Sequence, residues 1–98
     1  MTDPANCPDM PTLRAEIDAL DKELVRLLKR RSDHIDRAIE IKRAAGLPAR
    51  IPARVEEVVT HVRDEADRSA LDPDLVERLW RELIDWSIAR EAQRIDLD

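Results

Sequence analysis

The sequence predicts an all-α protein with one long helix followed by two shorter ones. Its 98 residues include one glycine, two tryptophans and neither phenylalanine nor tyrosine, while 40% of them are charged. A composition rich in Ala, Leu, Ile, Glu, Asp and Arg favours helices, since strands need more β-branched and aromatic residues. Apolar residues recur every three or four positions along most of the chain, which indicates helices with one buried face.

The chain is predicted to consist of a flexible leader, residues 1–8, and a single helical domain, residues 9–98. Asp9 or Thr12 can cap the N-terminus of the long helix, because both side chains accept hydrogen bonds from backbone amides. The helical pattern then continues without interruption to Gly46, where a glycine is typical of a C-terminal cap.

A loop bounded by two prolines separates the long helix from the two shorter ones. The second helix is predicted from about Pro52 to Ser69, with valines at helical spacing on one face. The third helix is predicted from Pro73 to about Ile95, with Asp72 as its N-cap and the proline in its first turn.

The long helix predicts a dimer. About 33 residues correspond to roughly 50 Å of helix, whereas a compact domain of this size has a radius of gyration of about 13 Å. Two shorter helices cannot cover both ends of it, so part of its apolar stripe needs a second copy of the chain. We therefore predict a homodimer with twofold symmetry.

Several classes of function are disfavoured by the sequence. The net charge is −5, whereas a nucleic-acid-binding domain of this size is normally basic. No apolar run approaches the roughly 18 residues of a membrane-spanning helix. The leader lacks the apolar stretch of a signal peptide, so we expect a cytoplasmic protein. His34 and His61 have no second ligand at metal-binding spacing, and we expect no metal site.

Charged residues occupy positions of the predicted apolar faces. Arg31 and Lys42 fall on the seam of the long helix, and Ser87 and Glu91 continue the stripe of the third helix. Ionised groups at such positions are costly unless they are paired. One interpretation is internal pairing, for example of Lys42 with Glu91 or of Arg31 with Asp18. The other is a cavity that holds an anion, since arginine binds carboxylates through two hydrogen bonds.

Arg14 suggests that such a cavity is shared between chains. It precedes Arg31 by 17 residues, which is about 25 Å along a helix. Two arginines of one helix cannot hold one small molecule across that distance. If Arg14 belongs to the site, it must come from the partner chain.

An ordered set of motifs extends over residues 9–95. Leu13-Arg14-x-x-Ile17-Asp18-x-Leu20-Asp21 is followed by Leu27-Leu28-x-x-Arg31, by Lys42 and finally by Ser87-x-x-x-Glu91. This set resembles the all-helical class of chorismate mutases. The resemblance implies the type II chorismate mutase fold, in which three-helix subunits form an intertwined homodimer with two sites. It also implies a cofactor-free pericyclic reaction of a small dicarboxylate.

The resemblance assigns roles to individual residues. The partner's Arg14 and Arg31 are expected to bind the substrate carboxylates, and Lys42 is expected to donate to the ether oxygen of the enolpyruvyl group. Catalytic roles are implied for Lys42, Glu91 and Arg31. The implied substrate-binding residues are Arg14, Arg31, Lys42, Arg54, Ser87 and Glu91.

Two positions depart from the mutase pattern. Mutases of this class generally have a glutamate directly after the helix-two arginine, where this chain has Val55. The segment Arg50-Ile51-Pro52-Ala53-Arg54-Val55 and the leader are instead similar to isochorismate-pyruvate lyases, which make salicylate and retain weak mutase activity. At the second position Glu91 replaces a usual glutamine. An ionised carboxylate would repel the ether oxygen, so Glu91 must be protonated to serve there.

The favoured prediction is therefore an isochorismate-pyruvate lyase with secondary chorismate mutase activity. A chorismate mutase is the main alternative, and the sequence also leaves open a 4-amino analogue as substrate. A non-catalytic helical dimerisation or binding module is the competing class. Against it stands the concurrence of four cations at the predicted site positions, Arg14, Arg31, Lys42 and Arg54.

Overall fold

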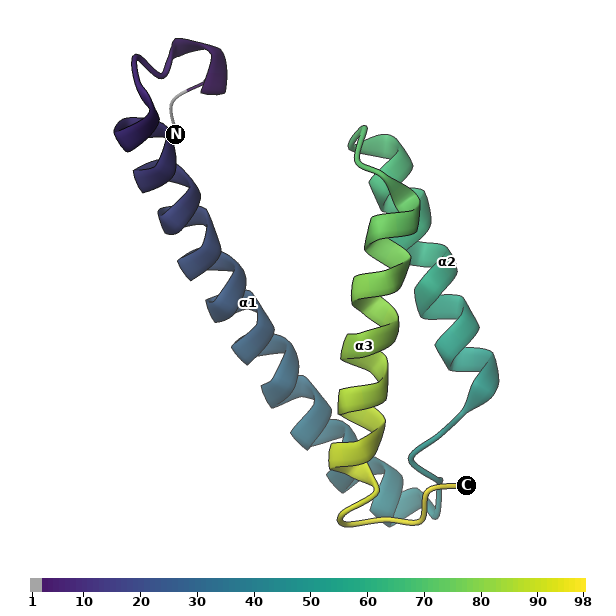
Figure 1. The fold of residues 1–98 in the computed structure, drawn as a ribbon. Coiled ribbons are helices and arrows are strands. Elements are labelled where there is room, and N and C mark those ends of the chain that lie inside the picture. The colour runs from purple at the N-terminus through teal and green to yellow at the C-terminus, as the bar shows by residue number, and fades with distance from the viewer. Residues whose placement is uncertain (1–2) are drawn as a thin grey trace. The chain divides into compact units, whose positions relative to one another are not determined.

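The computed structural model describes residues 3–98, and its helices follow one another in the predicted order (Figure 1). A short 3₁₀ helix, η1 (Pro4–Asn6), precedes α1 (Met10–Ala45), α2 (Pro52–Arg68) and α3 (Pro73–Glu91). Within the described residues there is no strand, so the all-α prediction is confirmed. None of the helices in this range is long and apolar enough to cross a membrane.

The chain divides into two compact units, and the division falls inside α1. The N-terminal unit extends to His34 and contains η1 and most of α1; the C-terminal unit is Ile35–Asp98 and contains the end of α1, with α2 and α3. Residues 1–2 of the predicted leader lie outside the described residues, and the rest of the leader includes η1.

Asp9 caps α1 in the N-terminal unit. Its carboxylate accepts a hydrogen bond of 2.8 Å from the backbone N–H of Thr12, and the hydrogen bonds from Thr12 lower the pKa of Asp9. Of the two predicted caps, Asp9 rather than Thr12 is used, and α1 therefore begins at Met10. Just before the helix, the Cys7 thiol donates to a carboxylate oxygen of Glu16 at 3.1 Å, which raises the pKa of the thiol.

The apolar seam of the N-terminal unit is exposed in the single chain. None of its described residues is buried, and Leu24 and Leu27 expose 57% and 52% of their surface. The single buried residue of α1, Ile39, belongs to the C-terminal unit. The periodicity therefore predicts the helix correctly, whereas the cover for its stripe does not come from within this unit.

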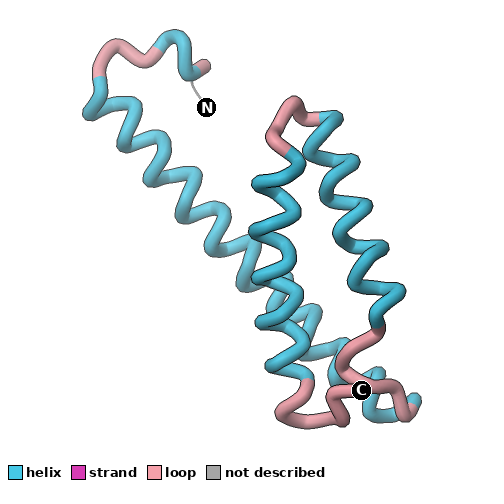
Figure 2. Tube along the Cα trace, turned by 45° about the vertical axis from the view of Figure 1, so that its right-hand side comes forward, coloured by secondary structure: helices cyan, strands magenta, loops and turns pink. Residues whose placement is uncertain are grey.

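In the C-terminal unit, α2 and α3 lie side by side as an antiparallel hairpin (Figures 1 and 2). The turn between them is closed by Asp72, whose carboxylate accepts a hydrogen bond of 2.9 Å from the N–H of Asp74, as expected for the predicted N-cap. The core of this unit consists of the buried apolar residues Ile39, Ala49, Val59, Ala66, Val76 and Ile84.

A ladder of ion pairs bridges α2 and α3 on their solvent side. Arg63 of α2 lies 3.1 Å from a carboxylate oxygen of Asp74 and 2.9 Å from one of Glu77, both on α3. Arg81 binds Glu77 at 2.8 Å and reaches back to Glu56 of α2 at 3.3 Å. The two arginines lower the pKa of Glu77, the hydrogen bond from Arg81 having the largest effect. We refer to these five residues as the hairpin ladder.

The end of α3 is attached to the end of α1. The Arg90 guanidinium binds the Asp36 carboxylate through two hydrogen bonds, 2.6 Å from Nε to Oδ1 and 3.0 Å from Nη2 to Oδ2. The same guanidinium lies 5.5 Å from the centre of the Trp86 ring, within the range of a cation–π contact. Arg90 therefore holds the last turn of α3 against the part of α1 that belongs to the same unit.

Gly46 ends α1 as predicted. It has a φ of 68°, a left-handed conformation that glycine adopts without strain. The N–H of Leu47 then donates to the carbonyl oxygen of Lys42 at 2.8 Å, the hydrogen bond of a Schellman C-cap. The backbone leaves the helix at this point and enters the loop that precedes α2.

The predicted end of α3 was wrong by about one turn. The helix was expected to continue to about Ile95, but it ends at Glu91. Beyond a short turn, the carbonyl oxygens of Asp96 and Leu97 accept hydrogen bonds of 2.7 Å each from the N–H groups of Ala49 and Arg50. Pairing with this loop requires an extended segment, so tertiary hydrogen bonds override the local helical pattern. The end of α2 differs from the prediction by one residue: the helix ends at Arg68, and the predicted last residue, Ser69, is its C-cap.

Candidate functional site

Two buried polar side chains project from the last turns of α3. Ser87 and Glu91 each expose 4% of their surface and are the buried polar residues of the described chain. They are one helical turn apart and continue the face that Ile84 buries. The Ser87 hydroxyl donates to the carbonyl oxygen of Leu83 at 2.8 Å. Both site residues predicted on the third helix are therefore buried in the protein.

Glu91 forms an ion pair with Lys42 across the helix ends. Lys42 Nζ lies 2.9 Å from Glu91 Oε1, and the two side chains are 19% and 5% exposed. Glu91 Oε1 is buried and accepts no hydrogen bond of suitable geometry from the described residues, so the close contact is electrostatic rather than a well-aligned hydrogen bond. The pairing predicted as one of the alternatives for Lys42 is confirmed.

Lys42 also has a hydrogen-bond acceptor in the loop after α1. Its ammonium group donates to the carbonyl oxygen of Ala49 at 2.9 Å. An ammonium has three N–H groups, and two neighbouring oxygens leave it able to donate to a third. A lysine held in this way can present positive charge to an oxygen of a bound molecule, provided that Glu91 keeps the pair in place.

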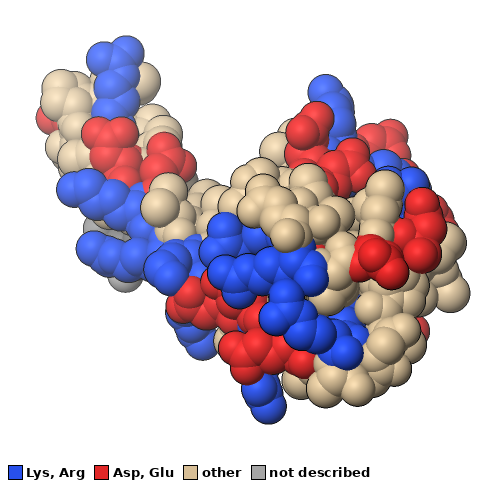
Figure 3. Space-filling view, turned by 90° about the horizontal axis from the view of Figure 1, so that it is seen from below, with Lys and Arg blue, Asp and Glu red and all other residues tan. Residues whose placement is uncertain are grey.

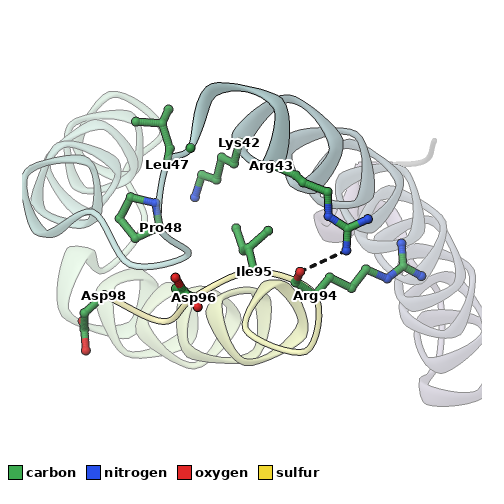
Figure 4. Close-up of a pocket in the computed structure, with 9 residues that line it drawn as sticks. Lys42, Arg43, Leu47, Pro48, Arg94, Ile95, Asp96 and Asp98 are labelled. Carbon is green, nitrogen blue, oxygen red and sulfur yellow. Dashed lines mark hydrogen bonds between the residues drawn. The ribbon is translucent and has the colours of Figure 1, made fainter.

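Lys42 also faces a pocket of about 300 Å³ in the C-terminal unit (Figure 4). In the close-up its amino group and the side chain of Ile95 point toward the interior of the pocket. At the rim, Arg43 donates to the carbonyl oxygen of Arg94 at 3.0 Å. Sequence analysis did not predict these walls, because they depend on backbone carbonyls and on the segment after α3.

Arg54 and Val55 occupy the start of α2. The Arg54 side chain is 60% exposed and is paired with Glu57, so it is not part of the buried ion pair. Val55 is half-buried and lines a second pocket of about 310 Å³, together with Arg50 and Asp85. The valine that distinguishes this chain from the mutase pattern thus contacts a cavity rather than only the protein core.

The other two predicted cations belong to the N-terminal unit. Arg14 is exposed near the start of α1, and Arg31 is partly buried further along the same helix. Lys42, Glu91 and Ser87 belong to the C-terminal unit. Their assembly into one site with Arg14 and Arg31 remains a prediction.

The described residues contain no group of three or more His, Cys, Asp or Glu side chains that could hold a metal ion. His34 is instead engaged locally, with Nδ1 at 2.7 Å from the carbonyl oxygen of Arg30. The side chains that the C-terminal unit brings together at the ends of α1 and α3 are the Lys42 ammonium and the Glu91 carboxylate, with the Ser87 hydroxyl one turn earlier on α3.

This fold and site define a class of small all-α proteins in which an ionic pair is set into a helical seam. Residues 13–92 match the sequence profile of the family described as "Chorismate mutase type II". The chain belongs to the type II chorismate mutase family. The resemblance found in the motifs is thereby confirmed, as is the all-α, three-helix fold of the subunit.

The chain is also similar in sequence to three individual proteins. It is 33% identical to the isochorismate pyruvate lyase of Pseudomonas aeruginosa over 94 residues, 95% of this chain and 91% of that protein. The T-protein of Haemophilus influenzae is 35% identical over 81 residues, 83% of this chain and 22% of the T-protein. The bifunctional chorismate mutase/prephenate dehydratase of Aquifex aeolicus is 30% identical over 88 residues, 87% of this chain and 24% of that enzyme. The chain thus spans nearly all of the first relative and about a quarter or less of the other two.

Proposed function

We propose that the protein catalyses the cofactor-free elimination of pyruvate from isochorismate, giving salicylate, with chorismate mutase activity as a secondary reaction. The observation that carries the proposal is the buried pair of Lys42 and Glu91, 2.9 Å apart between the ends of α1 and α3. A buried ion pair generally contributes less to stability than apolar residues of the same size. Its place in a chorismate mutase fold is therefore best explained by the chemistry of a bound substrate.

Both candidate reactions break the ether bond between the ring and the enolpyruvyl group. The protein has to hold that group folded over the ring, and this can supply several kcal/mol of the barrier reduction. In our proposal Lys42 donates to the ether oxygen as negative charge develops on it, while the Glu91 carboxylate holds the ammonium in place. Electrostatic groups placed in advance in an apolar environment are a large source of rate enhancement.

Val55 favours the lyase over the mutase. In the mutase pattern a glutamate at this position accepts a hydrogen bond from the ring hydroxyl of chorismate, and a valine cannot replace it. Isochorismate carries its hydroxyl elsewhere on the ring, so the loss is compatible with that substrate. The full-length match to a protein named isochorismate pyruvate lyase supports the same choice.

Chorismate mutase is the second candidate function. The family as a whole carries that name, and so does the bifunctional relative from Aquifex aeolicus. If the mutase reaction dominates, the missing glutamate at position 55 is not essential for recognition of the ring hydroxyl.

We further propose that the active form is a homodimer with two shared sites. The support comes from the N-terminal unit, whose apolar seam is exposed at Ile17, Leu20, Leu24, Leu27 and Leu28. A contiguous apolar stripe of this kind normally marks an interface. In such a dimer the partner's Arg14 would join Arg31 in binding the substrate carboxylates, and Arg54 would exchange Glu57 for the substrate.

The test is to supply chorismate and isochorismate separately at pH 5 and pH 7.5, and to follow salicylate fluorescence and prephenate formation. We expect salicylate from isochorismate and only weak prephenate formation from chorismate. Efficient prephenate formation without salicylate would replace the lyase by the mutase. No turnover of either substrate would contradict both and favour a binding module.

A variant pair tests the role of Val55 in that choice. Val55→Glu restores an acceptor for the ring hydroxyl of chorismate, so the ratio of prephenate to salicylate formation should rise by about tenfold or more, the value of a good hydrogen bond in a site. The matched control is Ala53→Glu, which introduces the same charge at an exposed position two residues earlier. An equal change in both variants would assign the effect to charge alone.

A further inference from the structure

The segment after α3 is tied to the loop after α1. We call Arg94–Asp98 the C-terminal strap. Its carbonyl oxygens at Asp96 and Leu97 accept hydrogen bonds of 2.7 Å from the N–H groups of Ala49 and Arg50. Two successive backbone hydrogen bonds fix the strap and the loop in one register.

Two side chains provide further attachments of the strap. The Arg43 guanidinium, at the end of α1, donates to the carbonyl oxygen of Arg94 at 3.0 Å. Ile95 is half-buried, and its side chain points into the pocket beside Lys42 (Figure 4). Figure 3 views the chain from the side where α1 and α3 end, and basic and acidic side chains stand next to each other there. The anchors of the strap are thus two backbone hydrogen bonds, one guanidinium, one apolar side chain and a contact of 4.0 Å between Arg50 Nε and Asp98 Oδ1.

The strap meets the site through Ala49. The N–H of Ala49 is bound by the strap, and the carbonyl oxygen of the same residue accepts from Lys42 Nζ at 2.9 Å. Ala49 is 2% exposed, so water does not replace either partner in the folded state. A lysine side chain is flexible along four carbons, and the direction of its ammonium depends on the acceptors that surround it. Of the two oxygens beside it, that of the Glu91 carboxylate is on α3 and that of the Ala49 carbonyl is on the loop that the strap holds.

We propose that the C-terminal strap is a positioning element for Lys42. It holds the Ala49 carbonyl in place, and that carbonyl together with Glu91 directs the ammonium toward the substrate oxygen. The kinetic part of this inference rests on the proposed function, because it assumes that Lys42 acts on the ether oxygen. Loosening the strap should then affect turnover more than substrate binding, which the arginines provide.

Two variants loosen the strap from different elements. Ile95→Gly removes its apolar anchor without changing the charge, and Arg43→Leu removes the donor to Arg94. We expect kcat to fall about tenfold in each while KM changes less than about twofold, since small displacements of a catalytic group cost rate. Arg43→Lys keeps a donor and should recover most of the activity. The matched control is Arg37→Leu, which breaks the exposed pair with Glu40 on the same helix and should leave kcat unchanged.

Hydrogen exchange measures the strap directly. The amides of Ala49 and Arg50 should exchange about five- to tenfold faster in Ile95→Gly and Arg43→Leu. In both variants the hydrogen bonds from these amides to the strap should open more often. The amide of Val59 in the core of α2 should keep its rate. Faster exchange with an unchanged kcat would overturn the proposal, and so would a lower kcat without faster exchange.

A measurement on the Lys42 ammonium tests the strap independently of the proposed function. A 15N resonance of the Lys42 ammonium is observable when its protons exchange slowly with water, as expected for a group held by one hydrogen bond and one ion pair. If the unmodified protein turns over neither substrate, the proposed function fails and the strap is judged on this resonance alone. Its loss in both strap variants supports the positioning role, and its persistence contradicts it.

Discussion

The C-terminal unit contains two sets of ion pairs that differ in what surrounds them. The hairpin ladder lies between α2 and α3 on the solvent side, where its carboxylate Glu77 is 30% exposed and Arg81 is 43% exposed. The pair of Lys42 and Glu91 lies at the other end of the hairpin, with side chains 19% and 5% exposed. Exposed pairs are screened by water and contribute little each, whereas a buried pair is costly to desolvate.

The comparison indicates that the two sets serve different purposes. The ladder satisfies its charges mutually, since each of its arginines has two carboxylate partners. In the buried pair, Glu91 Oε1 has no well-aligned donor among residues 3–98, although Lys42 is close to it. An incompletely satisfied polar group in the interior is a feature to be explained, and a ligand that completes its hydrogen bonds is one explanation. The ladder therefore stabilises the hairpin, whereas in our proposal the buried pair serves the reaction.

The largest expected effect is that of removing the buried cation. Lys42→Met should lower kcat/KM by about 10²–10³-fold, the usual consequence of removing a donor that stabilises developing charge. Steady-state kinetics with both substrates measure it. The control is Lys29→Met on the same helix, because Lys29 is 73% exposed and pairs with Asp33. A loss of less than about threefold in Lys42→Met would separate Lys42 from the chemistry.

The next effect concerns the exposed seam of the N-terminal unit. Leu24→Asp should weaken the proposed dimer by roughly a hundredfold or more, because each copy places an unpaired charge in the interface. Sedimentation over a range of concentrations measures the dissociation constant. Lys22→Asp introduces the same acid at an exposed polar position nearby and should have a small effect. A chain that sediments as a monomer without any substitution would contradict the shared site.

A smaller effect is expected for the carboxylate of the buried pair. Glu91→Gln should raise the rate at pH 7.5 by about three- to tenfold, because an amide donates to the ether oxygen without needing a proton. The rate at pH 7.5 tests it, with Glu40→Gln as the exposed control on α1. An unchanged or lower rate at pH 7.5 would show that the charge of Glu91 is required.

The hairpin ladder should produce the smallest effect, and in stability rather than activity. The folded protein lowers the pKa of Glu77 below its ordinary value of 4.5. Its contribution is therefore complete above about pH 4.5 and is lost as the pH falls through the lower folded value. Glu77→Gln should lower the melting temperature by a few degrees at pH 7 and flatten its decline below pH 4.5. A parallel decline in both proteins would show that Glu77 contributes nothing to the pH dependence.

The sequence predicted the helices well because their signals are local. The apolar periodicity, the caps at Asp9 and Asp72 and the glycine at position 46 each act within a few residues of where they stand. The end of α3 was predicted less well, since no glycine or proline marks it and the backbone bonds that stop the helix come from Ala49 and Arg50.

The site was predictable to the extent that it depends on side chains at seam positions. Lys42 and Glu91 interrupt apolar faces, so their pairing could be anticipated as one of two interpretations, and the structure confirms the contact. The carbonyl oxygen of Ala49 could not be anticipated, because every residue has one and only the fold selects which is used. Joining Arg14 and Arg31 to this pair requires an arrangement that local patterns do not specify.

The most direct test of the central claim measures stability and turnover on two double variants of the same protein. In Lys42→Leu/Glu91→Leu the apolar pair should leave the melting temperature unchanged or slightly higher, while turnover of both substrates is lost. In Glu77→Leu/Arg81→Leu the melting temperature should fall by a few degrees, with turnover kept within about twofold. A protein that unfolds when the buried pair is replaced, and loses activity when the ladder is replaced, would contradict the account.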